Sequence, residues 1–398
     1  MSVDEAAQMP RPVTASAAAA AGWRLTLLVV VVLAAAGLKG LLNSLMGPIL
    51  PMMAAYFGSA SAAQFITTAA ALGVAVGGPV SGWLLLRLGT RSLTLWGVAL
   101  YGLSGAAGLV VDQVPVLLGT RFVLGFVSVW VSTCAATLIA ERWTGDARAR
   151  MLGYFSSVGS AAGVATLLLA GAVAEVAGWR APFAIYLLVA VFVLLAALPS
   201  VPATRPVEAV TVEDKRGLWG LWGVFTWVMV AFVGIYTTSL QLPFLLYQDG
   251  VTSPATISGV ISAFALSMAA AAAAYGWIKP HIGMLAAWVA ALALVGAGTV
   301  TVGLGQGLVP AAAGSVLIGL GGGISIAHFY DVVALRSPAT VRGAAFGILS
   351  TANYLGQFVN PVILGPVQQG AGVHVLFVLV GGFFLLAALW HMVARRTL

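Results

Sequence analysis

The clearest pattern along the chain is a series of apolar runs, each long enough to cross a lipid bilayer as a helix. A membrane-spanning helix needs about 20 mostly apolar residues, and clusters of Gly, Pro and polar residues separate the runs. Most of these separators are short, so consecutive helices are expected to be antiparallel neighbours. The pattern predicts twelve membrane-spanning helices, over residues 24–50, 63–86, 92–111, 114–140, 151–173, 181–200, 219–247, 255–277, 282–304, 308–333, 342–365 and 372–394.

The composition agrees with this pattern. Hydrophobic residues make up 61% of the chain and charged residues 7%, whereas a soluble domain has about 25% charged residues. A soluble chain this apolar could not cover its own surface, which excludes a cytosolic enzyme, a secreted scaffold and a disordered protein. The formal net charge of +7 does not indicate a nucleic-acid partner, because in a membrane protein the placement of basic residues matters more than their sum. We therefore predict an all-α membrane protein.

One long polar stretch interrupts the series after the sixth predicted helix. We predict a cytoplasmic tail over residues 1–22, a six-helix bundle over 23–200, a cytoplasmic linker over 201–218 and a second six-helix bundle over 219–398. Nearly all loop Lys and Arg residues fall on the side of the N-terminus, and Arg180 falls in a loop on the other side. The positive-inside rule then places both termini in the cytoplasm. The abundance of Ala, Gly and Val favours a bacterial inner membrane.

The two sets of six helices share small and basic residues at one fixed offset, which the first matched pair sets at 276 − 82 = 194 residues. A duplicated six-helix unit would retain such matches at helix ends and packing sites. Two pseudo-symmetric halves of this kind are a transporter architecture, with the substrate site near the midplane between them. The matched pairs are Gly82-Trp83 with Gly276-Trp277, Gly125 with Gly319, Arg142 with Arg336, and Arg148 with Arg342.

Two motifs resemble those of the major facilitator superfamily. Residues 82–91 read GWLLLRLGTR, which looks like the family signature between helices 2 and 3, although Leu86 stands at its acidic position and Thr90 at its first basic position. The segment from Arg121 to Gly125 looks like the family's Arg-xxx-Gly motif in helix 4. The resemblance covers residues 25–396 and implies twelve helices in two six-helix bundles. It is strongest to the drug and metabolite efflux branch, but residues 151–173 lack that branch's Gly-Pro and Gly-Gly pairs.

The resemblance also implies that the loop after the second helix is a gate. In the family this loop latches the two halves in the outward-open state. The latch is in question here because its acid is missing, and the alternative is that the basic residues only anchor the topology. Glycines permit the tight turn and the close approach of helices. The predicted gating residues are Gly82, Arg87, Gly89, Arg91 and Glu141.

Two cations are predicted inside the membrane-spanning helices of the first half. An ionisable residue within the bilayer is expensive and is a functional candidate by default. Lys39 lies roughly 20 Å along the first helix at 1.5 Å per residue, and Arg121 lies in the outer third of the fourth. Helices 1 and 4 line the central cavity in the superfamily, so both cations could attract an anionic substrate or tune a proton site. Alternatively, Lys39 snorkels outward and Arg121 bonds backbone carbonyls.

Asp331 is the one carboxylate that the predicted boundaries place well away from helix ends. His328 lies three residues before it, so the two side chains share a helix face. A poorly hydrated carboxylate binds a proton more tightly, and histidine titrates near neutrality. Asp331 and His328 are therefore the predicted proton-coupling residues. Alternatively, Asp331 belongs to a cytoplasmic charge cluster with Arg336.

Uncharged polar residues complete the predicted substrate site. Asn353 and Gln357 lie on one stripe of the eleventh helix, where amides can bind a polar substrate or bond to neighbouring helices. Tyr236 and Gln241 lie in the seventh helix and Asn43 in the first, each before a proline. Helices 1 and 7 are repeat mates that break near their outer ends, which predicts an outer gate.

We see no nucleotide-binding motif, nucleophile elbow or metal-ligand cluster in the sequence. We therefore expect no cofactor, no metal and no enzymatic activity, and transport driven by a gradient. The prediction is a monomeric secondary active transporter, with a small solute, protons and the lipid bilayer as partners, that exports drug-like or metabolic compounds in a proton-coupled way. The alternative is an importer or exchanger of a small organic anion, which rests on Lys39 and Arg121.

Overall fold

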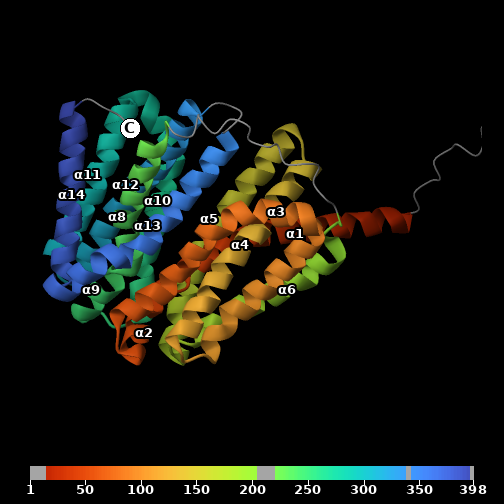
Figure 1. Cartoon of the computed structure of the whole chain (residues 1–398), viewed down its shortest axis with the longest axis horizontal. Helices are drawn as coiled ribbons and strands as arrows, with labels where there is room; N and C mark the ends of the chain where they lie inside the picture. Colours follow the sequence, from red (N-terminus) through yellow and green to blue (C-terminus); the bar gives the residue numbers. More distant parts are fainter. Residues whose placement is uncertain (1–14, 204–219, 338–341, 395–398) are drawn as a thin grey trace, which may run out of the picture.

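A computed structural model describes residues 15–203, 220–337 and 342–394, apart from the side chains of residues 15–21, 79, 145, 149, 342 and 343. In the described part of the chain, all the long elements are helices, and they form two groups that lie side by side (Figure 1). The prediction of an all-α membrane fold is confirmed. The predicted linker falls largely outside the described residues.

The first group, the N-terminal half, contains the helices up to residue 200. Short 3₁₀ turns (η1, η2 and η3) separate several of them. The elements are α1 (Ala15–Ser44), η1 (Gly47–Ile49), α2 (Leu50–Phe57), α3 (Ala60–Ala106), η2 (Ala107–Leu109), α4 (Val114–Arg142), α5 (Gly145–Ala177), η3 (Ala181–Phe183) and α6 (Ala184–Ser200).

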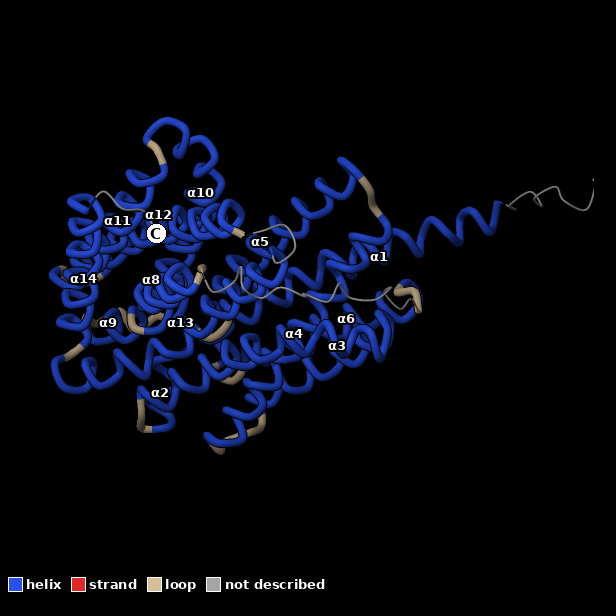
Figure 2. Tube along the Cα trace, turned by 45° about the horizontal axis from the view of Figure 1, so that its top comes forward, coloured by secondary structure: helices blue, strands red, loops and turns tan. Residues whose placement is uncertain are grey.

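The second group, the C-terminal half, begins after the linker. The described connections of this group are short, as the tube drawing shows (Figure 2). The elements are α8 (Trp222–Leu240), α9 (Leu242–Gln248), α10 (Pro254–Ile282), α11 (Met284–Leu304), α12 (Leu308–Arg336), α13 (Arg342–Ala371) and α14 (Val373–Ala394).

Several predicted boundaries need correction. The first helix begins at Ala15, inside the segment predicted as a tail. The second and third predicted helices are both present within α3, where non-helical backbone at Gly89 (φ 75°) separates them. Among the described residues, eleven helices are long and apolar enough to cross a membrane. The predicted helix that is not among these eleven is the eleventh, over residues 342–365, which forms α13 and carries several Asn and Gln residues.

Glycines bring α3 and α4 together in the N-terminal half, and α10 and α12 in the C-terminal half. A Cβ added to Gly125 would lie 1.8 Å from the carbonyl oxygen of Ala70, and one added to Gly319 would lie 2.4 Å from that of Phe264. The two contacts are related by the same offset, since 319 − 125 and 264 − 70 both equal 194. The internal repeat read from the sequence is therefore a repeat of packing contacts.

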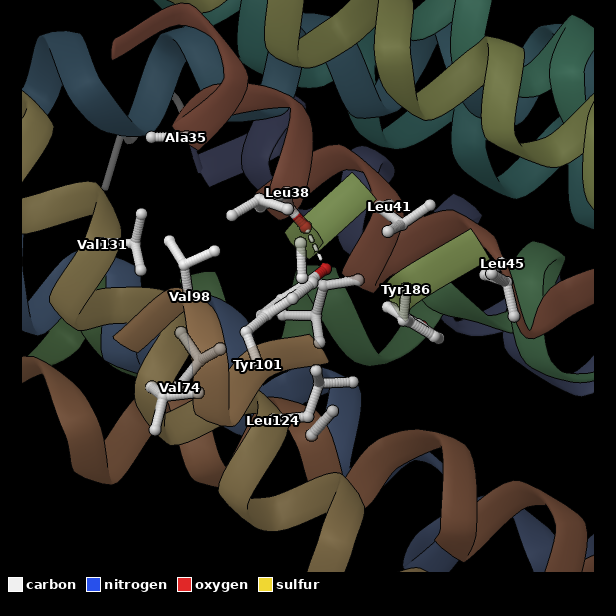
Figure 3. Close-up of a cluster of buried hydrophobic side chains, with 14 of the residues drawn as sticks. Ala35, Leu38, Leu41, Leu45, Val74, Val98, Tyr101, Leu124, Val131 and Tyr186 are labelled. Carbon is white, nitrogen blue, oxygen red and sulfur yellow. Dashed lines mark hydrogen bonds between the residues drawn. The ribbon is translucent and has the colours of Figure 1, made fainter. Parts of the chain in front are cut away.

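Each half has its own apolar core. In the N-terminal half, Leu45, Val98 and Leu124 are fully buried. The hydroxyl of Tyr101 donates a hydrogen bond of 2.6 Å to the carbonyl oxygen of Leu38, which ties α3 to α1 within this core (Figure 3). A second cluster joins the helices of the C-terminal half around Trp288 and Phe377. Each cluster lies mostly within one half, although Tyr354 joins the first cluster and Leu167 the second.

The two ends of the bundle differ in charge and in how the halves meet. We call the end with the α3 turn at Gly89 and the last turns of α4, α10 and α12 the basic end, because Arg142, Lys279 and Arg336 lie there. At the opposite end, α1 breaks before α2 and α8 breaks before α9, as the prolines predicted. The short helices α2 and α9 contact each other there.

Candidate functional site

A cavity of about 490 Å³ lies between the two halves. Helices α1, α3 and α4 form its wall on the N-terminal side, and α13 forms its wall on the C-terminal side. It extends to Ala344 near the start of α13, and therefore toward the basic end. Its lining residues are Lys39, Val74, Gly78, Ser81, Ser128, Val129, Ser132, Thr133, Ala344, Gly347, Ile348, Ser350, Thr351 and Tyr354.

Lys39 is the charged residue among those that line this cavity. Its side chain is exposed to the cavity space rather than packed into the core. The ammonium nitrogen lies 5.7 Å from the ring centroid of Tyr354 on α13, within the range of a cation–π contact across the two halves. Asn43, one turn further along α1, is also exposed but is not among the residues that line the cavity. Lys39 thus lines a cavity between the two halves, at the position that the sequence predicted.

Arg121 lies elsewhere, in the interior of the N-terminal half. Its guanidinium donates a 2.8 Å hydrogen bond to the carbonyl oxygen of Gly105 and lies over the rings of Phe183, at 4.6 Å, and Tyr186, at 5.0 Å. The residue is 1% exposed, so it does not line the cavity with Lys39. The expectation that both cations face one cavity is wrong, because the Arg121 face of α4 packs against α3 and α6. The structure instead shows the alternative, in which Arg121 donates a hydrogen bond to a backbone carbonyl oxygen, that of Gly105.

The polar stripe of α13 faces α8 over part of its length. Tyr236 donates a 3.2 Å hydrogen bond to the side-chain oxygen of Asn353, and Asn360 donates to the carbonyl oxygen of Val233 at 2.7 Å. Gln357 lies between them and is 6% exposed. The single stripe predicted from the spacing is present, and Tyr236, Asn353 and Asn360 use it to bond one helix to another.

Polar side chains join the two halves at the opposite end. The Gln64 amide nitrogen on α3 donates to the side-chain oxygens of Gln241, at 2.8 Å, and Gln368, at 2.9 Å. Gln241 in turn lies 3.4 Å from the side-chain oxygen of Asn360. We call Gln64, Gln241, Asn360 and Gln368 the amide cluster. Gln241, predicted to bind substrate, is fully buried in it.

Further contacts close the same end. Glu175 at the end of α5 accepts a hydrogen bond from the Ser253 hydroxyl at 2.9 Å, and Gln369 donates to the Ser61 hydroxyl at 2.7 Å. Gln64 and Glu175 were missed by sequence reasoning, which gave weight to polar residues deep within the predicted helices. Each of these two residues lies near the end of a helix, where polar residues are common, so its position in the sequence gives no sign of a special role.

The predicted proton-coupling pair lies in a separate network at the basic end of the C-terminal half. Tyr275 connects the pair, since its hydroxyl lies 3.3 Å from both His328 Nδ1 and Asp331 Oδ2. Asp331 also forms an ion pair of 2.6 Å with Lys279. The charge partner of Asp331 in this network is thus Lys279 on α10, and not the Arg336 considered from the sequence. The pair does not line the cavity that holds Lys39.

The buried end of this network is His328, which is fully buried and stacks on Trp288 with ring centroids 5.0 Å apart. Its Nε2 has no hydrogen-bond partner among the described residues. Among the same residues, no group of three or more His, Cys, Asp or Glu side chains could hold a metal ion. The network joins the buried His328 to Asp331 and Lys279 at its partly exposed end.

The predicted gating loop is built around Gly89, whose positive φ of 75° favours glycine. Gly82 has open space around it, so close packing does not require glycine there. Arg87 lies 4.3 Å from the ring of Trp83, and Arg91 donates a 2.9 Å hydrogen bond to the carbonyl oxygen of Leu198 on α6. Both contacts stay within the N-terminal half. A latch through Glu141 stays a prediction.

Comparisons with known proteins add to this geometry. A family model described as the Major Facilitator Superfamily matches residues 32–361. The arabinose-proton symporter of Escherichia coli (strain K12) is 28% identical over 183 residues, which cover 45% of this chain and 39% of the symporter. The chain thus spans well under two thirds of the curated relative that it matches.

Two solved structures share the fold. A crystal structure of the peptide transporter POT in complex with sulfate has a TM-score of 0.76 at 12% identity, and the match covers 92% of this chain and 94% of that one. A POT family transporter in complex with 5-aminolevulinic acid has a TM-score of 0.74 at 11% identity, with coverages of 93% and 95%. At these identities the likeness concerns the fold.

Proposed function

Since the chain belongs to the Major Facilitator Superfamily, we propose that it is a secondary active transporter that moves a small organic solute by alternating access. The observation that carries this proposal is the cavity between the two halves, which has the amide cluster on one side and the basic end on the other. Opening the amide cluster while closing the basic end would present the same cavity to the other side of the membrane.

We propose that the basic end faces the cytoplasm of a bacterium, with the protein in its inner membrane and both termini inside. The support is the placement of the loop Lys and Arg residues, which gather at this end. In this orientation the cavity belongs to an inward-facing arrangement, because the opposite end is held together by inter-half hydrogen bonds.

We propose that a proton gradient drives transport and that Asp331, Tyr275 and His328 carry the coupling. In the arrangement described, Asp331 forms an ion pair of 2.6 Å with the Lys279 ammonium. A movement of α10 against α12 would open this ion pair and leave the carboxylate without its charge partner. Coupling then follows from geometry, because the carboxylate accepts a proton in one arrangement and releases it in the other.

The direction of transport has two candidates. Export of a drug-like or metabolic compound in exchange for protons rests on the resemblance of the helix 4 motif to the efflux branch. Uptake together with protons is favoured by the distant relative, which is named as an arabinose-proton symporter. The two candidates predict opposite proton movements when the solute is added outside.

The test is proton flux in proteoliposomes with a pH-sensitive dye sealed inside. A panel of organic anions, neutral sugars and lipophilic cations is added outside to the wild type, to Asp331→Asn and to Asp146→Asn. Asp146 is an exposed carboxylate at the start of α5, outside the network, and serves as the matched control. Acidification of the interior by a transported solute indicates symport, and alkalinisation indicates antiport.

We expect Asp331→Asn to lose the proton signal while it keeps exchange of labelled solute between the two sides, and Asp146→Asn to behave as the wild type. Exchange of solute without any proton movement in the wild type would contradict the coupling but leave the transporter proposal standing. If no solute moves and the cavity is accessible from one side only, the transporter proposal itself fails.

A further inference from the structure

We propose that the cavity takes a small organic anion that carries hydroxyl groups, with its carboxylate on Lys39 and its hydroxyls on the serine-rich wall formed by α3 and α4. This inference rests on the proposed transport function and names the chemical class of the solute. It also separates the two predicted cations, because Lys39 serves the solute and Arg121 serves the packing of the N-terminal half.

The charge of the cavity argues for an anion. Lys39 is the charged residue among the fourteen that line it. The ion pairs of the described residues join Arg180 with Asp112, Lys279 with Asp331 and His374 with Asp249, and Lys39 is in none of them. An ammonium group facing a cavity within the membrane is costly unless an opposite charge compensates it. A carboxylate entering the cavity would supply that charge.

The hydrogen bonds of the wall on α3 and α4 argue for hydroxyls on the solute. The hydroxyls of Ser81, Ser128 and Ser132 donate to the carbonyl oxygens of Gly78, Gly125 and Ser128. Thr133 donates to the Ser81 hydroxyl oxygen at 3.1 Å. Because these hydrogens are engaged, the four oxygens offer the cavity their acceptor lone pairs. This wall is therefore matched to groups that donate, such as the hydroxyls of a polyol.

The wall on α13 is different. The structure describes no hydrogen bond from the hydroxyl of Ser350 or Thr351, so both can donate to a solute. Tyr354 adds an aromatic face close to the Lys39 ammonium. A carboxylate near Lys39 can therefore receive hydrogen bonds from the α13 side while the rest of the molecule donates to the side formed by α3 and α4. Two walls of opposite character orient an unsymmetrical solute.

The size of the cavity limits the solute to a small molecule. Its volume of about 490 Å³ lies in the lower part of the range of roughly 300–1,000 Å³ that small-molecule sites occupy. The cavity is therefore large enough for a six-carbon hydroxy acid with its waters. The lining combines hydroxyl-bearing residues with apolar ones such as Val74, Val129 and Ile348, so the carbon chain of such a solute also finds apolar contacts.

The test uses four six-carbon probes that differ at one chemical feature. Gluconate carries both the carboxylate and the hydroxyls, glucitol lacks the carboxylate, hexanoate lacks the hydroxyls, and glucamine replaces the negative charge by a positive one. Binding to the purified full-length chain is measured by titration calorimetry, and counterflow is measured in proteoliposomes. The variants are Lys39→Gln, Lys39→Arg and, as a control on the same helix, Arg24→Gln, whose exposed side chain lies over Trp23 outside the cavity.

We expect gluconate to bind at least about tenfold more tightly than the other three, which is the effect of one charge-assisted contact. Lys39→Gln should lose this preference, Lys39→Arg should retain most of it, and Arg24→Gln should match the wild type. Equal binding of gluconate and glucitol, an unchanged preference in Lys39→Gln, or binding of none of the four would overturn the inference. If the protein then transported a chemically different solute, the transporter proposal would stand although the inference about the solute class had failed.

Discussion

At the scale of single residues, the two cations within the N-terminal half have opposite surroundings. Lys39 faces a cavity, where a compact ammonium group can meet a solute. Arg121 contacts the rings of Phe183 and Tyr186, and one of its nitrogens donates a hydrogen bond to the carbonyl oxygen of Gly105. A planar guanidinium suits such a stacked site, and lysine does not replace it conservatively. The choice of Lys at one position and Arg at the other therefore matches two different tasks.

Arg121→Lys should lower the unfolding temperature of the purified protein without changing which solute it binds. The substitution removes the stacked contacts with Phe183 and Tyr186, and a desolvated cation–π contact contributes about 2 kcal/mol. Thermal unfolding in detergent and a binding titration measure the two properties separately. An unchanged unfolding temperature together with lost solute binding would show that Arg121 is a binding residue after all.

Asp112 gives a pH-dependent prediction outside the membrane-spanning segments. The carboxylate accepts a 2.7 Å hydrogen bond from the Tyr56 hydroxyl and pairs with Arg180, and these contacts lower the pKa of Asp112 below its ordinary value of 3.8. Its stabilising effect is therefore present above pH 3.8 and disappears as the pH falls through the lowered pKa. Asp112→Asn should reduce the unfolding temperature at neutral pH, and the difference should shrink in acid. A difference that persists unchanged in acid would contradict this account.

The sequence indicated where Lys39 and Asp331 lie, because ionisable residues are rare in apolar helices. It could not indicate which face of α4 carries Arg121, since membrane helices are apolar on every side and the pattern gives no inward face. For the same reason it could not identify Tyr275 or Lys279 as neighbours of Asp331. These two come from another helix, and only the packing of α10 against α12 brings them together.

At the scale of helices, glycine determines how closely the paired helices approach. Gly125 and Gly319 occupy equivalent places in the two halves, each against a backbone carbonyl of a neighbouring helix. The sequence predicted this equivalence from a fixed offset between small residues. Gly40 of α1 shows the same principle, because an added Cβ would lie 2.5 Å from the carbonyl oxygen of Gly159 on α5.

Gly125→Ala should destabilise the N-terminal half, because its Cβ would overlap the carbonyl oxygen of Ala70. Inserting a methyl group into a closely packed contact costs about 1–3 kcal/mol. Gly119→Ala on the same helix is the matched control, since nothing lies within 4 Å of the added Cβ there. Thermal unfolding of both variants measures the difference. Equal unfolding temperatures would mean that α3 and α4 are not packed through Gly125.

The amide cluster predicts a change in conformation rather than in stability. Gln64→Leu removes both hydrogen bonds that the Gln64 amide nitrogen donates to the C-terminal half. Buried neutral hydrogen bonds contribute about 1 kcal/mol each, so the ratio of closed to open molecules at the opposite end should fall roughly five- to thirtyfold. A thiol reagent reacting with a cysteine placed at Thr237, a buried residue whose hydroxyl accepts a 3.2 Å hydrogen bond from Asn360 of the cluster, reports this opening.

Gln248→Leu serves as the control for this experiment. Gln248 is an exposed amide at the end of α9, outside the amide cluster. Its substitution should leave the labelling rate at position 237 unchanged. Equal labelling rates in Gln64→Leu and Gln248→Leu would mean that the amide cluster does not hold the opposite end closed.

At the scale of the whole molecule, the fold was largely predictable and the conformation was not. Apolar runs and the repeat offset predicted two similar helical halves, because the length of a span and the positions of small packing residues can be read directly from the sequence. Which end of the cavity is closed depends on contacts such as those of Gln64 and Glu175 with the other half. Each contact contributes a small free energy, and a single sequence does not show how they sum.

Alternating access is the central claim, and distances between spin labels at the two ends test it most directly. Cys134 is the one cysteine and is buried, so a Cys134→Ala background permits labels at chosen sites. One pair joins Ala55 on α2 to Tyr247 on α9 at the opposite end, and the other joins Arg87 to Leu335 at the basic end. All four residues are exposed.

The account predicts that acidification, or addition of a transported solute, lengthens the distance between positions 55 and 247 while it shortens the distance between positions 87 and 335. Gln64→Leu should move both pairs in the same sense without solute. Two distances that stay fixed under every condition, or that lengthen and shorten together, would contradict alternating access around the Lys39 cavity.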